Sequence, residues 1–124
     1  MSAEQRLIFI VEDDEAVRAS MRVLLEASGY AVQDFDSAED LLAAGTVHQA
    51  GCIILDYNLS GMSGMDMIEI LRAQNVQIPA IMVSSNGRQL IARAAKAGVA
   101  AVLHKPMAAD ALTQWLEQIF ATAR

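Results

Sequence analysis

Short apolar runs alternate along the chain with segments of helical periodicity, and this alternation limits the possible folds more than any other feature. Apolar runs bounded by polar or turn residues are typical of strands that are buried on both faces. When helical segments separate such strands, each helix crosses over the sheet and the strands run parallel. The expected strands are Leu7–Val11, Tyr30–Phe35, Cys52–Leu55, Ile78–Val83 and about Ala100–Leu103. The pattern therefore predicts an α/β fold with a buried parallel sheet.

Helix signals fill the segments between these runs. Ser37, with Asp40 three residues later, resembles a capping box and predicts the start of a helix that ends near Gly45. Ser28-Gly29 and Gly98 are typical helix ends. The first expected helix has Val17, Met21, Leu24 and Leu25 on one face, and the last has Leu112, Trp115, Leu116, Ile119 and Phe120. Both sets follow the spacing of an amphipathic helix.

Composition narrows the class of protein. At 124 residues with 54% hydrophobic residues, the chain is the size of one compact domain. A net charge of −6 argues against unaided binding to nucleic acid or to an anionic membrane surface. Cys52 is the single cysteine, which excludes an internal disulfide and a cysteine-rich zinc site. Because no apolar stretch approaches the roughly twenty residues of a membrane span and no signal segment is seen, we expect a cytoplasmic location.

Four of the five expected strands end in a polar residue that can take part in chemistry. Asp13, Asp56, Ser84 and Lys105 each lie within one or two residues of an apolar run. The carboxyl ends of parallel strands share one edge of the sheet, which is where open α/β sheets bind ligands. We therefore expect these four side chains to converge.

The acidic residues at this edge favour a hard divalent cation. Glu12, Asp13 and Asp56 would repel one another and raise each other's pKa unless a cation neutralised them. Oxygen ligands without histidine or cysteine favour Mg²⁺, with Mn²⁺ as a possible substitute. Ser84 offers a hydroxyl donor and Lys105 a positive charge, and both suit the oxygens of a phosphoryl group. Asp56 is the best candidate nucleophile, since it ends the most uniformly apolar and hence central strand.

These residues also carry a resemblance to a known family. The pattern consists of Val11-Glu12-Asp13-Asp14-Glu15, Asp56 with Gly64 eight positions later, Ser84, and Lys105-Pro106. From about Leu7 to Phe120 the chain resembles a response-regulator receiver domain of two-component signalling. The resemblance implies a single receiver domain over residues 1–124. It also implies a flavodoxin-like sheet of order 2-1-3-4-5 flanked by five helices.

The resemblance assigns roles to the site residues. It implies that Asp56 takes a phosphoryl group from a histidine of a sensor kinase or a phosphotransfer protein, in a Mg²⁺-dependent reaction. Asp13 would then bind the metal directly, Glu12 through water and Asn58 through its backbone carbonyl, with Asp56 completing the set. Ser84 would turn toward the phosphoryl group, Lys105 would pair with it, and the Lys105-Pro106 peptide bond would be cis. Such a domain is not a metabolic enzyme, since it catalyses only its own phosphorylation and dephosphorylation, and its downstream effector is not specified by the sequence.

Three positions depart from the family pattern. Val102 stands where an aromatic residue usually lies, so we expect activation to pass through the backbone after Ser84 and the helix that follows. Ser60 stands where the loop often carries proline, which predicts a less rigid loop. Asn58 and Asn86 occupy the positions that modulate the lifetime of the phosphoryl group. Neither is an obvious general base, so we expect a moderately long-lived phosphoryl state.

Other interpretations of the same residues exist. Taken singly, Asp14 suits a simple helix cap, and the remaining polar residues suit turns or surface positions. A Mg²⁺-dependent aspartyl phosphohydrolase is a rival, but such families usually place a second acid where this chain has Asn58. A degenerate receiver that acts as a phosphorylation-independent interaction module is another rival, suggested by Val102 and Ser60. The joint spacing of the acids, the serine and the lysine favours the phosphoacceptor.

Overall fold

Strands and helices alternate throughout the part of the chain that the structure describes. The computed structural model describes residues 6–85, 90–105 and 109–122. The strands are β1 (Leu7–Val11), β2 (Ala31–Phe35), β3 (Cys52–Asp56), β4 (Ala80–Ser84) and β5 (Ala101–His104). The helices are α1 (Glu15–Ala27), α2 (Ala38–Ala44), α3 (Gly64–Ala73), α4 (Ile91–Lys96) and α5 (Ala109–Thr122), and a short 3₁₀ helix, η1, covers Val47–Gln49. The predicted α/β class is confirmed.

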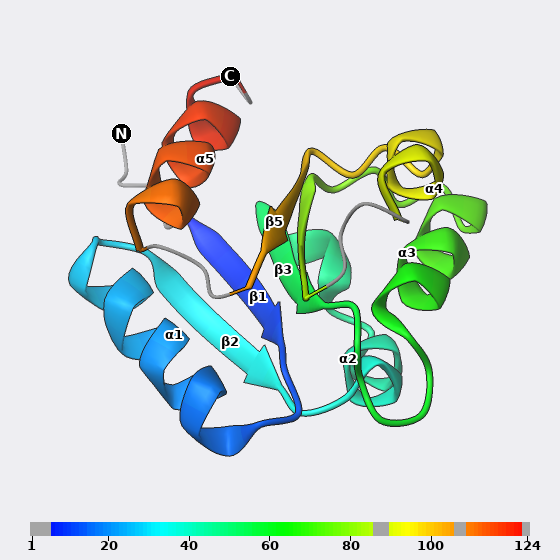
Figure 1. Cartoon of the computed structure of the whole chain (residues 1–124), viewed down its shortest axis with the longest axis horizontal. Coiled ribbons are helices and arrows are strands. Elements are labelled where there is room, and N and C mark those ends of the chain that lie inside the picture. The colour runs from blue at the N-terminus through cyan, green and yellow to red at the C-terminus, as the bar shows by residue number, and fades with distance from the viewer. Residues whose placement is uncertain (1–5, 86–89, 106–108, 123–124) are drawn as a thin grey trace.

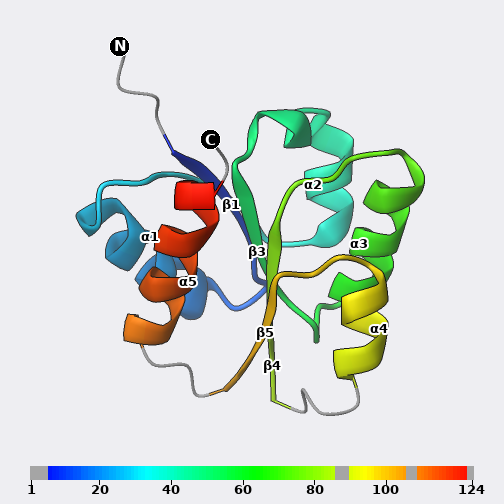
Figure 2. The ribbon, with the colours of Figure 1, turned by 90° about the horizontal axis from the view of Figure 1, so that it is seen from above.

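All five strands run parallel in one sheet of order β2-β1-β3-β4-β5. Helices α1 and α5 cover one face, and α2, α3 and α4 cover the other (Figures 1 and 2). Every residue of β3 and of β4 is buried, as expected of inner strands packed on both sides. The order and the central place of β3 agree with the prediction.

The sheet separates two hydrophobic cores, because alternate residues of each strand point to opposite faces. Phe9, Ile53 and Met82 point toward α2, α3 and α4, where they pack with Leu41 and Ile68. On the other face the core contains Ile8, Ile10, Cys52, Ile54 and Ile81, packed against Met21 and Leu25 of α1 and Leu112, Leu116 and Ile119 of α5.

Four of the five strands differ by one or two residues from the boundaries that the sequence predicted. The fourth strand begins at Ala80 and not at Ile78, because Pro79 has no N–H to donate to a ladder. The carbonyl of Pro79 still accepts a hydrogen bond from the N–H of Ile53 at 3.0 Å. The second and fifth strands each begin one residue later than expected, and β3 extends to include Asp56.

The helix caps follow the local sequence. Asp14 caps α1 by accepting a hydrogen bond from the N–H of Val17 at 3.0 Å, and Ser37 caps α2 through the N–H of Asp40 at 3.0 Å, as predicted. Gly45 ends α2 with a φ of 70°, a conformation that favours glycine. None of the helices in the described ranges is long and apolar enough to cross a membrane.

Candidate functional site

The carboxyl ends of the inner strands lie level with one another at one edge of the sheet. In the register, Val11 pairs with Leu55, and Asp56 pairs with Val83. Ser84 in turn pairs with His104. The residues that follow these pairs are therefore brought together from four strands, as the sequence predicted.

Backbone hydrogen bonds join the strand ends at this edge. The N–H of Glu12 donates to the carbonyl of Phe35 at 3.1 Å, and the N–H of Tyr57 donates to the carbonyl of Val83 at 2.9 Å. The N–H of Lys105 donates to the carbonyl of Ser84 at 3.0 Å. These hydrogen bonds hold the first residues of the loops that carry the site side chains.

Three carboxylates form an acidic cluster at the centre of the edge. One oxygen from each of Glu12, Asp13 and Asp56 lies within 4.8 Å of the others. Glu12 and Asp56 are buried, at 5% and 4% exposure, whereas Asp13 is exposed. Burial raises the pKa of Glu12, the N–H of Asp14 opposes this by donating to it, and the charge of Asp56 adds to the rise.

Asp13 departs from the expectation that the clustered acids raise one another's pKa. The Ser60 hydroxyl donates to Oδ2 of Asp13 at 2.9 Å and the Ser60 N–H donates to the same oxygen at 3.1 Å. These hydrogen bonds, with the hydroxyl as the largest cause, lower the pKa of Asp13. Asp13 is therefore held in its charged form even beside two other acids.

Lys105 reaches into the cluster from the end of β5. Its Nζ lies 2.6 Å from Oδ2 of Asp56, forming a hydrogen-bonded ion pair (2.7–2.9 Å is usual for such pairs). Burial alone would lower the pKa of Lys105, but the hydrogen bond and charge of Asp56, aided by the charges of Glu12 and Asp13, raise it overall. The lysine is thus a fixed positive charge beside the proposed nucleophile.

Ser84 and Asn58 flank Asp56. Ser84 is fully buried at the end of β4. The N–H of Asn58 donates to Oδ1 of Asp56 at 3.0 Å, so both oxygens of Asp56 accept hydrogen bonds. Asn86 and the Lys105-Pro106 bond lie outside the described residues.

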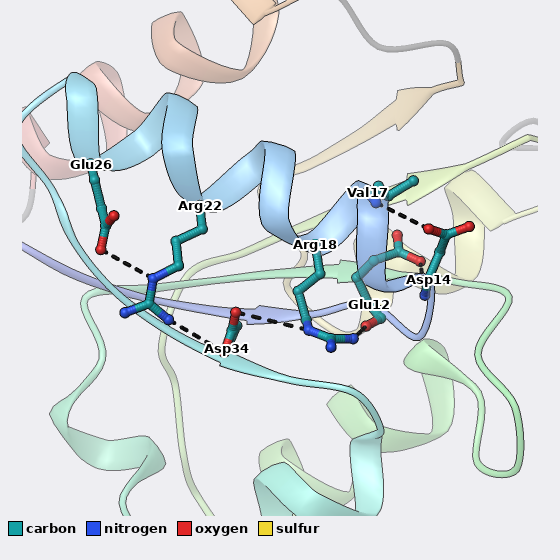
Figure 3. A network of polar contacts seen from close by, with 7 residues as sticks. All are labelled: Glu12, Asp14, Val17, Arg18, Arg22, Glu26 and Asp34. Atoms are coloured by element: carbon teal, nitrogen blue, oxygen red, sulfur yellow. Dashed lines mark hydrogen bonds and ion pairs between the residues drawn. The ribbon is translucent and has the colours of Figure 1, made fainter.

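A network of arginine contacts holds the loop between β1 and α1. Arg18 donates to the carbonyl of Glu12 at 2.8 Å and lies 3.8 Å from Asp34. Arg22 pairs with Asp34 at 3.4 Å and with Glu26 at 3.1 Å (Figure 3). Arg18 and Arg22 therefore connect α1 to β2, and Arg18 also holds the backbone at Glu12, next to Asp13. Sequence reasoning did not single out these arginines, although their spacing of four residues on one helical face was a visible signal.

Beside the acidic cluster the surface opens into a cavity of about 670 Å³ between α1 and the sheet. Glu12, Asp56 and Lys105 contribute to its wall, and Val17 and Met21 of α1 are among its apolar lining residues. Asp56 therefore faces space that can admit a phosphoryl group, although its carboxylate is almost fully buried.

This fold and this site together define a receiver domain of a two-component response regulator. A parallel sheet of order 2-1-3-4-5 carries an acidic cluster, a serine and a lysine at its carboxyl edge. The sequence model of the protein family described as response regulator receiver domain matches residues 8–117 of the chain. The chain belongs to this family.

The relatives are response regulators. The chain is 37% identical over 100 residues to the transcriptional regulatory protein FixJ of Azorhizobium caulinodans, a match that covers 80% of this chain and 47% of FixJ. It is 34% identical over 113 residues to the response regulator protein TodT of Pseudomonas putida, covering 90% of this chain and 50% of TodT. The chain thus spans about half the length of these relatives.

Solved structures give the same result. The response regulator StyR superposes with a TM-score of 0.86 at 36% identity, covering 93% of this chain and 59% of StyR. The N-terminal part of FixJ superposes with a TM-score of 0.83 at 28% identity, covering 94% of each chain. The receiver fold of the chain is therefore established by both comparisons.

Proposed function

We propose that Asp56 accepts a phosphoryl group from a histidine of a sensor kinase or phosphotransfer protein in the cytoplasm, and that this single receiver domain then controls an effector. The observation that carries the proposal is the setting of Asp56. Its buried carboxylate lies 2.6 Å from the Lys105 ammonium and within 4.8 Å of the two acids that follow β1. Such a setting suits phosphoryl transfer, in which catalysis rests mainly on positioning and charge neutralisation.

In the proposed transfer an oxygen of Asp56 attacks the phosphorus, forming a carboxyl O–P bond. The N–P bond of the donor histidine breaks, and its electron pair stays on the imidazole nitrogen. Lys105 stabilises the negative phosphoryl oxygens, and Asn58 orients the carboxylate through its N–H. Ser84 supplies a hydroxyl that turns toward the transferred group. Hydrolysis of the acyl phosphate by water ends the cycle, so the only reactions that the domain catalyses are on itself.

The acidic cluster fits a Mg²⁺ ion. Its donors are oxygen atoms, a preference of Mg²⁺, and one or two carboxylates with waters satisfy that ion. Asp13, Asp56, Glu12 through water and the backbone carbonyl of Asn58 would hold it, and Mn²⁺ would be an acceptable substitute. When bound, the ion neutralises charge on the carboxylates and on the phosphoryl oxygens.

Neither rival interpretation has support in the site or in the comparisons. Aspartyl phosphohydrolases usually have a second acid at the position where this chain has Asn58. A degenerate receiver would be expected to lack part of the acidic cluster or its lysine, whereas Glu12, Asp13 and Lys105 all lie beside Asp56. The phosphoacceptor interpretation gives a role to all three carboxylates of the cluster and to Lys105.

We propose that the response to phosphorylation passes through the backbone after Ser84 and through α4, the helix that follows. Val102 packs as a partly buried side chain against the core beneath α2, α3 and α4. A valine has no ring to swing between exposed and buried positions. The hydrogen bond from the N–H of Lys105 to the carbonyl of Ser84 offers a direct connection between β4 and β5 instead.

Intact-mass spectrometry tests the phosphoacceptor. The parent chain, incubated with Mg²⁺ and acetyl phosphate, should gain the mass of one phosphoryl group, which should persist beyond seconds. Asp56→Asn should gain none, and the control Asp110→Asn, which changes an exposed residue of α5, should behave as the parent. An unmodified parent would refute phosphorylation, and a modified Asp56→Asn would place it elsewhere.

A further inference from the structure

Ser60 makes the contact in this site that the proposed transfer does not use. Its hydroxyl and its N–H both donate to Oδ2 of Asp13, at 2.9 and 3.1 Å, across 47 residues of sequence. The loop between β3 and α3 is thereby joined to the loop between β1 and α1. The partner in this contact is one of the residues proposed to bind Mg²⁺.

The loop that carries Ser60 is held independently of Asp13. Before Ser60, the N–H of Asn58 donates to Asp56, and Leu59 is buried against the core. After it, the N–H of Met62 donates to Oε2 of Glu39 at 3.0 Å. The loop therefore presents Ser60 from a fixed position.

Asp13, in contrast, has an exposed side chain that packing does not restrain. Both hydrogen bonds from Ser60 go to one oxygen of Asp13, Oδ2, so neither of them engages Oδ1. An exposed aspartate samples several rotamers, and fixing one of them before an ion arrives removes an entropy cost of binding. The contact between Ser60 and Asp13 should therefore raise the affinity of the acidic cluster for a cation.

We propose that Ser60 is a positioning residue that orients Asp13 for Mg²⁺. The inference rests on the proposed function, because it assumes that the acidic cluster holds this ion. Ser60 acts only through Asp13, and its role requires both a donor hydroxyl and a donor N–H at this place in the loop. The ordering cost of one side chain corresponds to about two- to tenfold in affinity.

Titration of the full chain with Mg²⁺, by calorimetry and by the NMR shifts of loop amides, tests the proposal. Ser60→Ala keeps the N–H donor and should weaken Mg²⁺ binding about two- to fivefold, within the range expected for one side chain. Ser60→Pro removes both donors and should weaken binding up to about tenfold. Ser60→Thr keeps both donors and should restore the parent affinity.

The matched control is Ser63→Ala, which removes a hydroxyl from the same loop. Ser63 caps α3 through the N–H of Asp66 at 3.1 Å, so this variant should lose stability but keep the Mg²⁺ affinity of the parent. A purely structural role for Ser60 predicts the opposite pattern, with stability changed and affinity unchanged.

The possible outcomes distinguish the role of Ser60 from the proposed Mg²⁺ site. If the parent binds Mg²⁺ and Ser60→Ala binds equally or more tightly, the role of Ser60 is overturned while the metal site stands. If the parent binds no Mg²⁺, the proposed metal site fails and the inference falls with it. Weaker binding by Ser60→Ala with recovery in Ser60→Thr supports both.

Discussion

Replacing Gly64 with alanine should strain the backbone at Asp56. Gly64 is the first residue of α3, and a Cβ there would lie 2.6 Å from the carbonyl oxygen of Asp56 and 3.0 Å from Cδ1 of Leu55. Ordinary van der Waals contacts of a Cβ are 3.4–4 Å. The leucine methyl can rotate, but the carbonyl belongs to a central buried strand, so the overlap is relieved by moving the backbone that carries the proposed phosphoacceptor, Asp56.

The expected loss of stability follows from two opposing effects. Overpacking a close contact costs about 1–3 kcal/mol, and the better helix propensity of alanine returns at most about 1 kcal/mol. Gly64→Ala should therefore lose about 1–2 kcal/mol of unfolding free energy. In urea this corresponds to a midpoint lower by roughly 0.5–1 M. Phosphorylation of Asp56 by acetyl phosphate should also slow, because the carboxylate moves relative to Lys105.

Gly51→Ala is the matched control, because it also creates a close contact but one that lies against a side chain. A Cβ at Gly51 would meet the ring of Phe120, which is a partly buried side chain and can move. This variant should lose less stability than Gly64→Ala, and its phosphorylation rate should equal that of the parent. The reasoning would be refuted if Gly64→Ala unfolded at or above the parent's urea midpoint, or if both variants slowed phosphorylation equally.

Three further predictions concern single residues. Burial raises the pKa of Cys52 to about 12, so a thiol reagent at pH 8 should label the native chain far more slowly than the urea-unfolded chain; equal rates would contradict this. The raised pKa of Glu12 in the folded state means that its protonation contributes stability below pH 4.5, which is lost as pH rises through the folded pKa. Glu12→Gln in metal-free buffer should therefore gain stability relative to the parent between pH 4.5 and pH 7, and urea melts showing a constant or falling difference would exclude this. Asn75 adopts a φ of 67°, so Asn75→Ala should cost about 1 kcal/mol while Asn75→Gly should not, as thermal melts of the two variants can show.

The strands and helices were predictable because their signals are local, whereas the order of the strands in the sheet was expected from the family resemblance. Uniform apolar runs identified the buried strands, and Ser37 and Gly45 marked the ends of α2 through caps that the structure contains. The one sizeable boundary difference, at β4, follows from Pro79, which lengthens the apolar run without contributing an N–H to the ladder. The 3₁₀ helix η1 was not predicted, since its residues carry no periodic apolar signal.

The sequence predicted which residues of the site lie together at the strand ends, but not the contacts made by the loops. Strand ends that share one edge placed Asp13, Asp56 and Lys105 together, and the structure agrees. The contact of Ser60 with Asp13 could not be read in this way, because it depends on the path of a loop and not on a strand register. The lowered pKa of Asp13 follows from that unforeseen contact.

The hydrogen bonds along the carboxyl edge of the sheet turn the site into a set of natural reporters. The N–H groups of Glu12, Tyr57 and Lys105 each donate to a backbone carbonyl within the last two residues of a neighbouring strand. Hydrogen–deuterium exchange at these three amides would register any opening of one strand end from the next. Because each amide belongs to a different loop of the site, exchange resolved by residue would show the order in which the loops respond when Asp56 is modified.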